Sequence, residues 1–224
     1  MNLRIFDSVD DLVRGAAQTL VQRAVSKSRS VVALSGGSTP KPMYELLGTK
    51  YRDELAKSRI VWVVVDERYV PLDDPQSNAA MMQRTLFRDG ILPGHEFLRF
   101  KTELNDPAAT VREFEADWAR LAIDKLGVVV LGVGEDGHTA SLFPGTPVLD
   151  VVDRVAAEVF VPRLNQWRVT LTLPVIRDAG LRMVLAAGES KRGILEDARR
   201  GVDLPIVRAT SGLESWWFTD QNIK

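Results

Sequence analysis

A histidine and an aspartate in a glycine-rich segment have the types and spacing for acid–base chemistry. The segment Gly132-Val133-Gly134-Glu135-Asp136-Gly137-His138 follows the apolar run Val128–Leu131. An aspartate two residues before a histidine can orient the imidazole ring or stabilise its charged form, which makes the histidine a base near neutral pH. We therefore predict that His138 acts as a general base and that Asp136 orients it.

The same segment matches G-x-G-x-x-G, a pattern of dinucleotide-binding turns. Those turns also require a long helix after the glycines and an acidic residue at the end of the next strand. Here Pro144 and Gly145 end any helix soon after it starts, and the next predicted strand, 155–161, ends in Val161-Pro162. The sequence therefore argues against a dinucleotide-dependent oxidoreductase.

A second glycine-rich segment, Ser35-Gly36-Gly37-Ser38-Thr39-Pro40, follows the apolar run Val31–Leu34. Its free amides and the hydroxyls of Ser38 and Thr39 predict a cradle for a phosphate or an oxyanion, because a turn into a helix presents several N–H groups to a ligand. We expect Thr39 to cap the following helix and Pro40 to occupy its first position. An ordinary strand-to-helix turn has the same composition and stays an alternative.

Charged side chains follow two further apolar runs. Asp66-Glu67-Arg68 comes directly after 60–65, and Arg68 is predicted to clamp a phosphate or carboxylate or to stabilise an oxyanion. The alternative is a solvent-exposed strand end with an internal ion pair.

Lys191 lies in the predicted first turn of a helix, where a cation is unfavourable unless an anion binds there. Compensation of Lys191 by Glu189 is the alternative.

Three other residues of chemically versatile types receive no catalytic or binding role. His95, in the loop Leu92-Pro93-Gly94-His95-Glu96-Phe97, is predicted to be a surface residue. Trp216 and Trp217 fit a core, an edge strand or an interface.

The elements that position these residues alternate between buried strands and helices. Strands are predicted at 3–6, 31–34, 60–65, 128–131 and 183–187, and helices at 9–25, 40–47, 77–87, 107–123 and 190–199, with Ser8 and Ser77-Asn78 as caps. This order predicts an α/β fold of three αβα layers, with a mostly parallel, Rossmann-like sheet and helices on both faces. No linker divides the chain, so we expect a single domain over residues 1–224. Ligands of such sheets bind at the carboxyl ends of the strands.

Composition excludes several classes of protein. The 224 residues carry 29 Lys+Arg and 30 Asp+Glu, a net charge of −1, which argues against a nucleic-acid partner. There is no cysteine, only two histidines and no H-E-x-x-H, so no metal is expected; G-x-S-x-G is also absent. No apolar run spans a membrane and no signal peptide begins the chain, so we expect a cytoplasmic protein without a membrane partner. The chain is expected to be a monomer or a small homo-oligomer.

These segments together resemble the 6-phosphogluconolactonase family, part of a larger group that includes glucosamine-6-phosphate deaminase. SGGSTP, DERYVP, SNAAMM, GVGEDGHTASLFPG, RVTLTLP and AGESK occur in the family's order, over about residues 5–218. In the deaminases the histidine is typically followed by I-A-F-N-E-P, with a glutamate that assists it. This chain has 139–144 as Thr-Ala-Ser-Leu-Phe-Pro instead, and Arg68 where the deaminases have tyrosine. Both differences favour the lactonase.

The resemblance implies a reaction and a role for each residue. The reaction is hydrolysis of 6-phospho-D-glucono-1,5-lactone to 6-phosphogluconate, the second step of the oxidative pentose phosphate pathway, without metal or organic cofactor. His138 takes a proton from the water that attacks C1, Asp136 orients His138, and Arg68 stabilises the oxyanion or binds sugar hydroxyls. The expected substrate-binding residues, mainly for the phosphate, are Gly36, Gly37, Ser38, Thr39, Asp66, Arg168 and Lys191, with Arg168 the weaker contributor.

Two alternatives to a lactonase stay open. One is an isomerising deaminase of amino-sugar phosphates, which the missing glutamate argues against. The other is a non-catalytic sugar-phosphate sensor. No helix-turn-helix extension and no basic patch supports a sensor, and the pair of Asp136 and His138 indicates an enzyme.

Overall fold

A parallel sheet forms the centre of the protein in the computed structural model, which describes residues 1–212 and 214–223. Its seven strands lie in the order β1-β10-β9-β6-β2-β3-β5, and every adjacent pair is parallel. Their bounds are β1 Asn2–Ile5, β2 Arg29–Leu34, β3 Arg59–Val64, β5 Glu96–Leu98, β6 Val128–Gly132, β9 Leu181–Ala186 and β10 Ser215–Thr219. The central strands are apolar on both faces because helices cover both faces.

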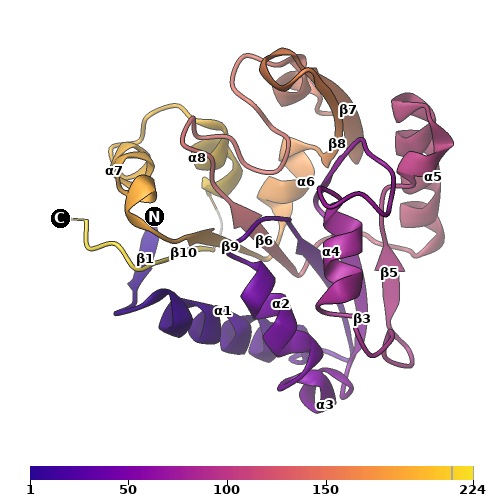
Figure 1. Ribbon diagram of the computed structural model, residues 1–224, viewed down its shortest axis with the longest axis horizontal. Helices are drawn as coiled ribbons and strands as arrows, with labels where there is room; N and C mark the ends of the chain where they lie inside the picture. The colour runs from indigo at the N-terminus through magenta and orange to yellow at the C-terminus, as the bar shows by residue number, and fades with distance from the viewer. Residues whose placement is uncertain (213, 224) are drawn as a thin grey trace.

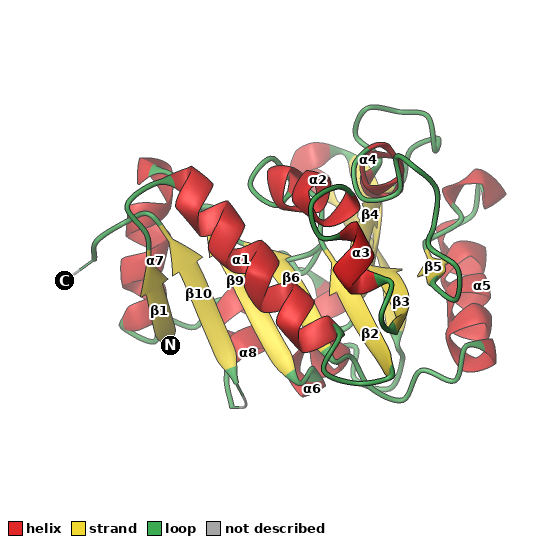
Figure 2. Ribbon diagram, turned by 90° about the horizontal axis from the view of Figure 1, so that it is seen from below, coloured by secondary structure: helices red, strands yellow, loops and turns green. Residues whose placement is uncertain are grey.

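The helices form the two outer layers. Figures 1 and 2 show α1, α2 and α3 on one face of the sheet and α6 and α8 on the other, with α4 and α5 towards the β3–β5 edge. The bounds are α1 Val9–Ala24, α2 Lys41–Gly48, α3 Arg52–Leu55, α4 Asn78–Arg84, α5 Pro107–Arg120, α6 Leu173–Asp178, α7 Arg192–Arg199 and α8 Pro205–Thr210. The predicted α/β fold with a mostly parallel sheet between helical layers is confirmed.

A small antiparallel sheet, which the sequence did not predict, stands beside the large one. It has the order β4-β8-β7, with bounds Asp66–Arg68, Gln166–Leu171 and Ala156–Val161. Only Val65 separates β3 from β4, so the small sheet starts at the carboxyl end of the strand next to the β5 edge of the large sheet (Figure 2). The predicted strand at 155–161 exists, but it belongs to this second sheet.

The predicted helix starts are partly confirmed. The Ser8 and Ser77 hydroxyls accept hydrogen bonds from the amides of Asp11 and Ala80, both at 3.1 Å, so both serines are caps. Thr39 does not cap α2: Pro40 is its N-cap residue, without a side-chain bond, and the helix begins at Lys41. This prediction was wrong because the turn continues through 38–40 before the first helical hydrogen bond, which Pro40 O accepts.

The helix predicted from Ser190 also starts later. A 3₁₀ turn covers Glu189–Lys191, and α7 begins at Arg192, so Lys191 is the residue before the α-helix. No helix follows β6 within 133–146. This agrees with the prediction that the glycine-rich segment is not a dinucleotide-binding turn, because such a turn leads into a long helix. Among the described residues, no helix is long and apolar enough to cross a membrane.

His95 is buried, contrary to the surface position predicted for it. Its exposed fraction is 9%. Trp62 Nε1 donates to Nδ1 of His95 at 3.1 Å, so Nε2 carries the proton and donates to Ser58 O at 2.9 Å. Burial lowers the pKa of His95. The loop composition around His95 gave no sign of Trp62, which lies on β3.

The two C-terminal tryptophans lie on an interior strand. Trp217 is 1% exposed, and Trp216 is partly buried on β10, which pairs with β1 on one side and β9 on the other. Of the three places that the sequence left open, the core is the correct one for Trp217.

Candidate active site

A cavity of about 450 Å³ opens at the carboxyl ends of β2, β3, β6 and β9, beside the small sheet. The structure brings together here nine of the ten residues predicted for the site, and these line the cavity: Gly36, Gly37, Ser38, Thr39, Asp66, Arg68, His138, Arg168 and Lys191. The tenth, Asp136, contacts His138. Residues up to about 150 positions apart in the chain therefore surround one space, as expected for the ends of parallel strands.

The loop after β6 holds His138 and Asp136 together. Nδ1 of His138 lies 2.5 Å from Oδ1 of Asp136, and the backbone amide of His138 donates to the same oxygen at 3.2 Å. Gly134 permits this turn, because a Cβ on it would lie 2.0 Å from His138 Nδ1. With Asp136 at Nδ1, the imidazole carries its proton there and leaves Nε2 as the basic nitrogen.

Asp136 is held in its ionised form. Burial alone would raise its pKa, but the hydrogen bonds with the side chain and backbone of His138, and the nearby charge of Arg163, outweigh burial and lower the pKa below its usual value. Nη2 of Arg163 lies 2.5 Å from Oδ2 of Asp136. An ionised carboxylate both orients the imidazole and stabilises the imidazolium that forms when His138 takes a proton.

Phe143 supplies an apolar surface beneath the imidazole. The rings of His138 and Phe143 are stacked, with centroids 4.3 Å apart and 26° between the planes. The sequence reasoning missed Phe143 and Arg163, which both line the cavity. Phe143 lies only five residues after His138, so the sequence around His138 could have indicated their contact. Arg163 lies in a turn of the small sheet, and nothing near His138 in the sequence points to it.

The loop Gly36–Thr39 packs closely against Asn78 at the wall of the cavity because Gly36 has no side chain. A Cβ on Gly36 would lie 1.7 Å from Oδ1 of Asn78, the residue whose Nδ2 donates to Asp66 O at 2.7 Å. Within the described part of the chain, no amide from Gly36 to Thr39 donates to a backbone acceptor. These amides are therefore available to an anion in the cavity.

Two arginines face each other across the small sheet. Arg68 on β4 is paired in register with Arg168 on β8, and each has a buried Nε that has no hydrogen-bond partner among the described residues. Burial, together with the charge of Arg68, lowers the pKa of Arg168. Like charges directly opposite in a sheet are destabilising. An anion bound between them would relieve this repulsion.

Arg68 makes no ion pair with the carboxylates that precede it in the chain. Nη1 of Arg68 donates to Gln76 O at 2.7 Å. Of the ion pairs within 4.0 Å between described residues, none involves Arg68, so the alternative of an internal ion pair at this strand end was wrong.

Asp66 and Glu67 are adjacent carboxylates with different surroundings. Asp66 is on the cavity side, 5% exposed, and accepts a hydrogen bond from Ser141 Oγ at 2.7 Å. Glu67 is 1% exposed and accepts from the amides of Arg68, Asn78 and Ala79 at 2.7–2.9 Å. Burial raises the pKa of Glu67 above its usual value, because it outweighs the three hydrogen bonds, which lower the pKa. Glu67 therefore holds the start of α4 and does not line the cavity.

Lys191 reaches the cavity from the loop after β9. Gly188, at φ +92°, donates its amide to Oδ1 of Asp220 at 2.8 Å, which fixes the start of this loop. Lys191 and Glu189 form no ion pair within 4.0 Å in the described structure, so compensation of Lys191 by Glu189 is not seen. Lys191 contributes a third cation to the cavity.

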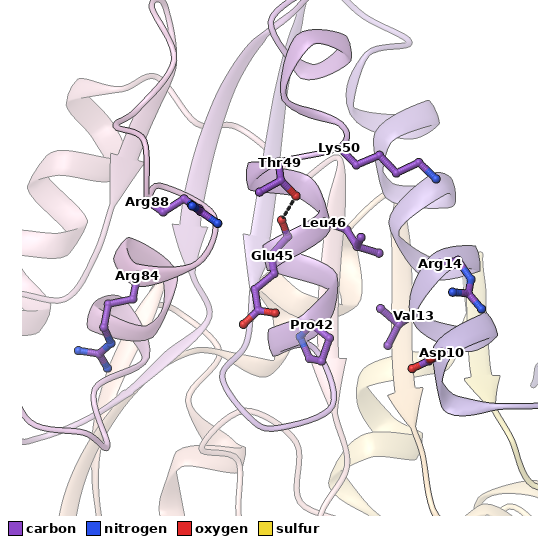
Figure 3. A pocket seen from close by; sticks show the side chains of 10 residues that line it. All are labelled: Asp10, Val13, Arg14, Pro42, Glu45, Leu46, Thr49, Lys50, Arg84 and Arg88. Atoms are coloured by element: carbon purple, nitrogen blue, oxygen red, sulfur yellow. Dashed lines mark hydrogen bonds between the residues drawn. The ribbon is translucent and has the colours of Figure 1, made fainter.

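A larger cavity, of about 610 Å³, lies away from these residues, between α1, α2 and the end of α4 (Figure 3). Its charged side chains have both signs, including Asp10, Arg14, Glu45 and Arg84, and Figure 3 shows the head of Arg84 pointing away from Glu45. No histidine lines it. Polar groups do not converge there, so size alone does not make it the candidate site.

No metal centre accompanies the candidate site in the described ranges. Over residues 1–212 and 214–223, no group of three or more histidine, aspartate or glutamate side chains is arranged to hold a metal ion. The cavity itself presents the imidazole of His138 beside the side chains of Arg68, Arg168 and Lys191.

Comparisons with known proteins agree on one family. Residues 7–217 match the family model described as glucosamine-6-phosphate isomerases/6-phosphogluconolactonase. Similar curated proteins include the 6-phosphogluconolactonases of Rattus norvegicus, 30% identical over 97% of this chain and 91% of that one, and of Haemophilus influenzae, 31% identical over 97% and 96%. The 6-phosphogluconolactonase of Synechocystis sp. is 35% identical over 79% of this chain and 75% of its own.

Solved structures show the same fold. A crystal structure of 6-phosphogluconolactonase from Thermotoga maritima has a TM-score of 0.79 at 27% identity, covering 97% of both chains. The enzyme from Leishmania guyanensis has a TM-score of 0.83 at 26% identity, covering 97% of this chain and 96% of that one. A monomeric glucosamine-6-phosphate deaminase has a TM-score of 0.84 at 20% identity, covering 99% and 98%, which shows the fold alone.

Proposed function

The chain belongs to the family of glucosamine-6-phosphate isomerases and 6-phosphogluconolactonases, and on this basis we propose that it is an enzyme that hydrolyses 6-phospho-D-glucono-1,5-lactone to 6-phospho-D-gluconate. The observation that carries the proposal is the pair of Asp136 and His138 in a cavity that also contains Arg68, Arg168 and Lys191. A phosphorylated lactone needs a base for water and cations for its phosphate and its oxyanion. We also propose that this reaction serves the oxidative pentose phosphate pathway in the cytoplasm.

The phosphate is bound, in this proposal, by the loop Gly36–Thr39 together with Arg168 and Lys191. The amides of this loop are available to a ligand, and the buried Nε of Arg168 has no protein partner among the described residues. Charge-assisted hydrogen bonds to a phosphate are about twice as strong as neutral ones. Since the phosphate does not react, these contacts set affinity and place C1 of the lactone.

His138 then activates water. Its Nε2 takes a proton from the water whose oxygen attacks C1, which gives a tetrahedral oxyanion. The bond between C1 and the ring oxygen breaks, and the proton on Nε2 passes to the departing ring oxygen, so that the products are the carboxylic acid and the C5 hydroxyl. General acid–base catalysis of this kind contributes about 10²–10⁴-fold. Arg68 stabilises the oxyanion on C1, since it lies in the same cavity as His138.

The residues after His138 support the lactonase over the isomerising deaminase. Thr139-Ala140-Ser141-Leu142-Phe143-Pro144 contains no carboxylate, and Phe143 stacks on the imidazole. The Asp136 carboxylate, at Nδ1, is the partner that His138 has in this structure. The glutamate that typically follows the histidine in the deaminases has no counterpart in this segment. The curated relatives above are named 6-phosphogluconolactonase.

The test is hydrolysis of freshly generated 6-phosphogluconolactone, measured against its spontaneous rate. We expect wild type to accelerate hydrolysis and to release no ammonia from glucosamine 6-phosphate in a parallel assay. Ammonia release would move the protein to the deaminases. Saturable binding of sugar phosphates without acceleration of either reaction would make it a sensor and would refute the proposal.

A further inference from the structure

Arg163 is a side chain near the candidate base whose role the proposed function leaves unassigned. It lies in the 3₁₀ turn Pro162–Leu164 between β7 and β8, and its guanidinium reaches the far side of Asp136. Nη2 of Arg163 is 2.5 Å from Oδ2 of Asp136, while Oδ1 is 2.5 Å from Nδ1 of His138. The two oxygens of one carboxylate are thus divided between the imidazole and the guanidinium.

Arg163 also contacts the second support of the imidazole. Its Cζ lies 4.9 Å from the centroid of the Phe143 ring, and the same ring stacks on His138. The contacts form a closed cycle that runs from His138 to Asp136, Arg163, Phe143 and back. Asp136 holds the edge of the imidazole and Phe143 holds its face, and Arg163 touches both.

From this cycle we propose that Arg163 is a positioning residue, which acts on His138 through Asp136 and Phe143. The inference rests on the proposed function, in which His138 is the base. A carboxylate bonded on one oxygen only can rotate, whereas a second charged partner on the other oxygen fixes its plane. A fixed Asp136 keeps the His138 proton on Nδ1 and Nε2 free for water. Arg163 thereby connects the loop after β6 of the large sheet to the small sheet.

No other described side chain near Asp136 can replace the ion pair that Arg163 makes with its carboxylate. Among the described residues, Arg163 is the only lysine or arginine within 4.0 Å of the Asp136 carboxylate. The Arg163 side chain is 53% exposed, and exposed ion pairs contribute little to the stability of a fold. We therefore expect its loss to affect turnover and to leave the fold intact.

Steady-state kinetics on the lactone separate positioning from substrate binding. We expect Arg163→Met to lower kcat by about ten- to hundredfold, because small displacements of a reacting group are this costly, with KM within about threefold. Arg163→Lys keeps the charge and should recover part of kcat. A rise in KM at unchanged kcat would make Arg163 a substrate-binding residue and overturn the proposal.

The matched control is Arg154→Met. Arg154 lies just before β7 of the same hairpin, and it forms ion pairs with Glu158 and Glu115 outside the cavity. We expect wild-type kcat and KM from it. If Arg154→Met lowered kcat as much as Arg163→Met, the effect would be a general one of the hairpin, and the proposal would fail.

A double-mutant cycle tests the route through Asp136. If Arg163 acts through this carboxylate, Arg163→Met should reduce kcat much less in an Asp136→Asn background than in wild type. Equal reductions in both backgrounds would show that Arg163 acts independently of Asp136, against the proposal.

Imidazole NMR of the free protein gives a readout that does not depend on the reaction. The chain has only two histidines, and His95 is held in the Nε2–H form by Trp62 and Ser58, so its signals serve as an internal reference. We expect His138 in the Nδ1–H form in wild type, and a mixture of both forms in Arg163→Met with His95 unchanged. Unchanged His138 signals would overturn the positioning role. Absence of lactone hydrolysis by wild type, with the His138 signals shifting as expected, would refute the proposed function alone.

Discussion

The large parallel sheet and the small antiparallel sheet contribute different groups to the same cavity. The loops after β2 and β6 of the large sheet supply backbone amides and His138, while Arg68 and Arg168 lie within strands of the small sheet. A strand buried on both faces is mostly apolar, so the polar groups of the large sheet gather beyond the ends of its strands. A strand of the antiparallel sheet alternates between two faces, so β8 places Arg168 toward the cavity and Val169 on the opposite face. Proton transfer is thus assigned to the large sheet. Anion binding is assigned to both sheets, since the loop Gly36–Thr39 and Lys191 follow strands of the large sheet and Arg68 and Arg168 lie on the small one.

Removing His138 should have the largest effect, since the large sheet supplies the proposed base. We expect His138→Ala to lower kcat by about 10²–10⁴-fold, with little change in the affinity for 6-phosphogluconate. The measurement is hydrolysis of the lactone and calorimetric binding of the product. His95→Gln is the control, because His95 is buried away from the cavity and should affect stability more than kcat. A kcat near wild type in His138→Ala would show that His138 is not the base, and the assignment of proton transfer to the large sheet would be wrong.

Removing Arg168 should weaken binding instead of turnover. A hydrogen bond to a charged group contributes about 1.5–3 kcal/mol, so we expect Arg168→Met to raise KM by about ten- to hundredfold with kcat changed much less. Inhibition by inorganic phosphate should weaken by the same factor. A fall in kcat at constant KM would show that Arg168 acts in the chemical step beside Arg68, and its assignment to phosphate binding would be wrong.

Glu67 tests a part of the small sheet that lies outside the cavity, since it is on β4 and holds the start of α4. Glu67→Ala leaves three amides and the Ser77 hydroxyl without this acceptor, which should lower the free energy of unfolding by about 2–3 kcal/mol. Urea denaturation measures this value. The exposed Glu45→Ala is the control and should stay within about 0.5 kcal/mol of wild type. A similar result for both variants would mean that Glu67 is dispensable for holding the start of α4.

The smallest expected effect is the pH dependence of stability that Asp136 causes. Its pKa is lowered in the folded protein, so the stabilisation is present above the unfolded-state value of about 3.9 and is lost as pH falls through the folded-state value. The stability difference between wild type and Asp136→Asn should therefore be constant near neutral pH and shrink below about pH 4. Asp53→Asn, at an exposed position, corrects for loss of a carboxylate. A difference that grew on acidification would contradict the lowered pKa.

Local patterns in the sequence sufficed for much of the large sheet. Apolar runs such as Val128–Leu131 indicate a strand buried on both faces, and the glycines and polar residues after each run mark the strand exits. Asp136 and His138 are two residues apart, so their contact follows from the loop alone. The predicted positions at these exits all line or adjoin one cavity because parallel strands end at the same edge.

Only the tertiary structure decided the contacts between distant segments. Arg68 and Arg168 are opposite each other because a short antiparallel strand follows β3, and Arg163 reaches Asp136 because the β7–β8 hairpin turns toward the loop after β6. The burial of His95 depends on Trp62, 33 residues earlier in the chain. Residue types and local spacing determine which groups are available for chemistry, whereas the pairing of charges depends on distances that strand order and register set.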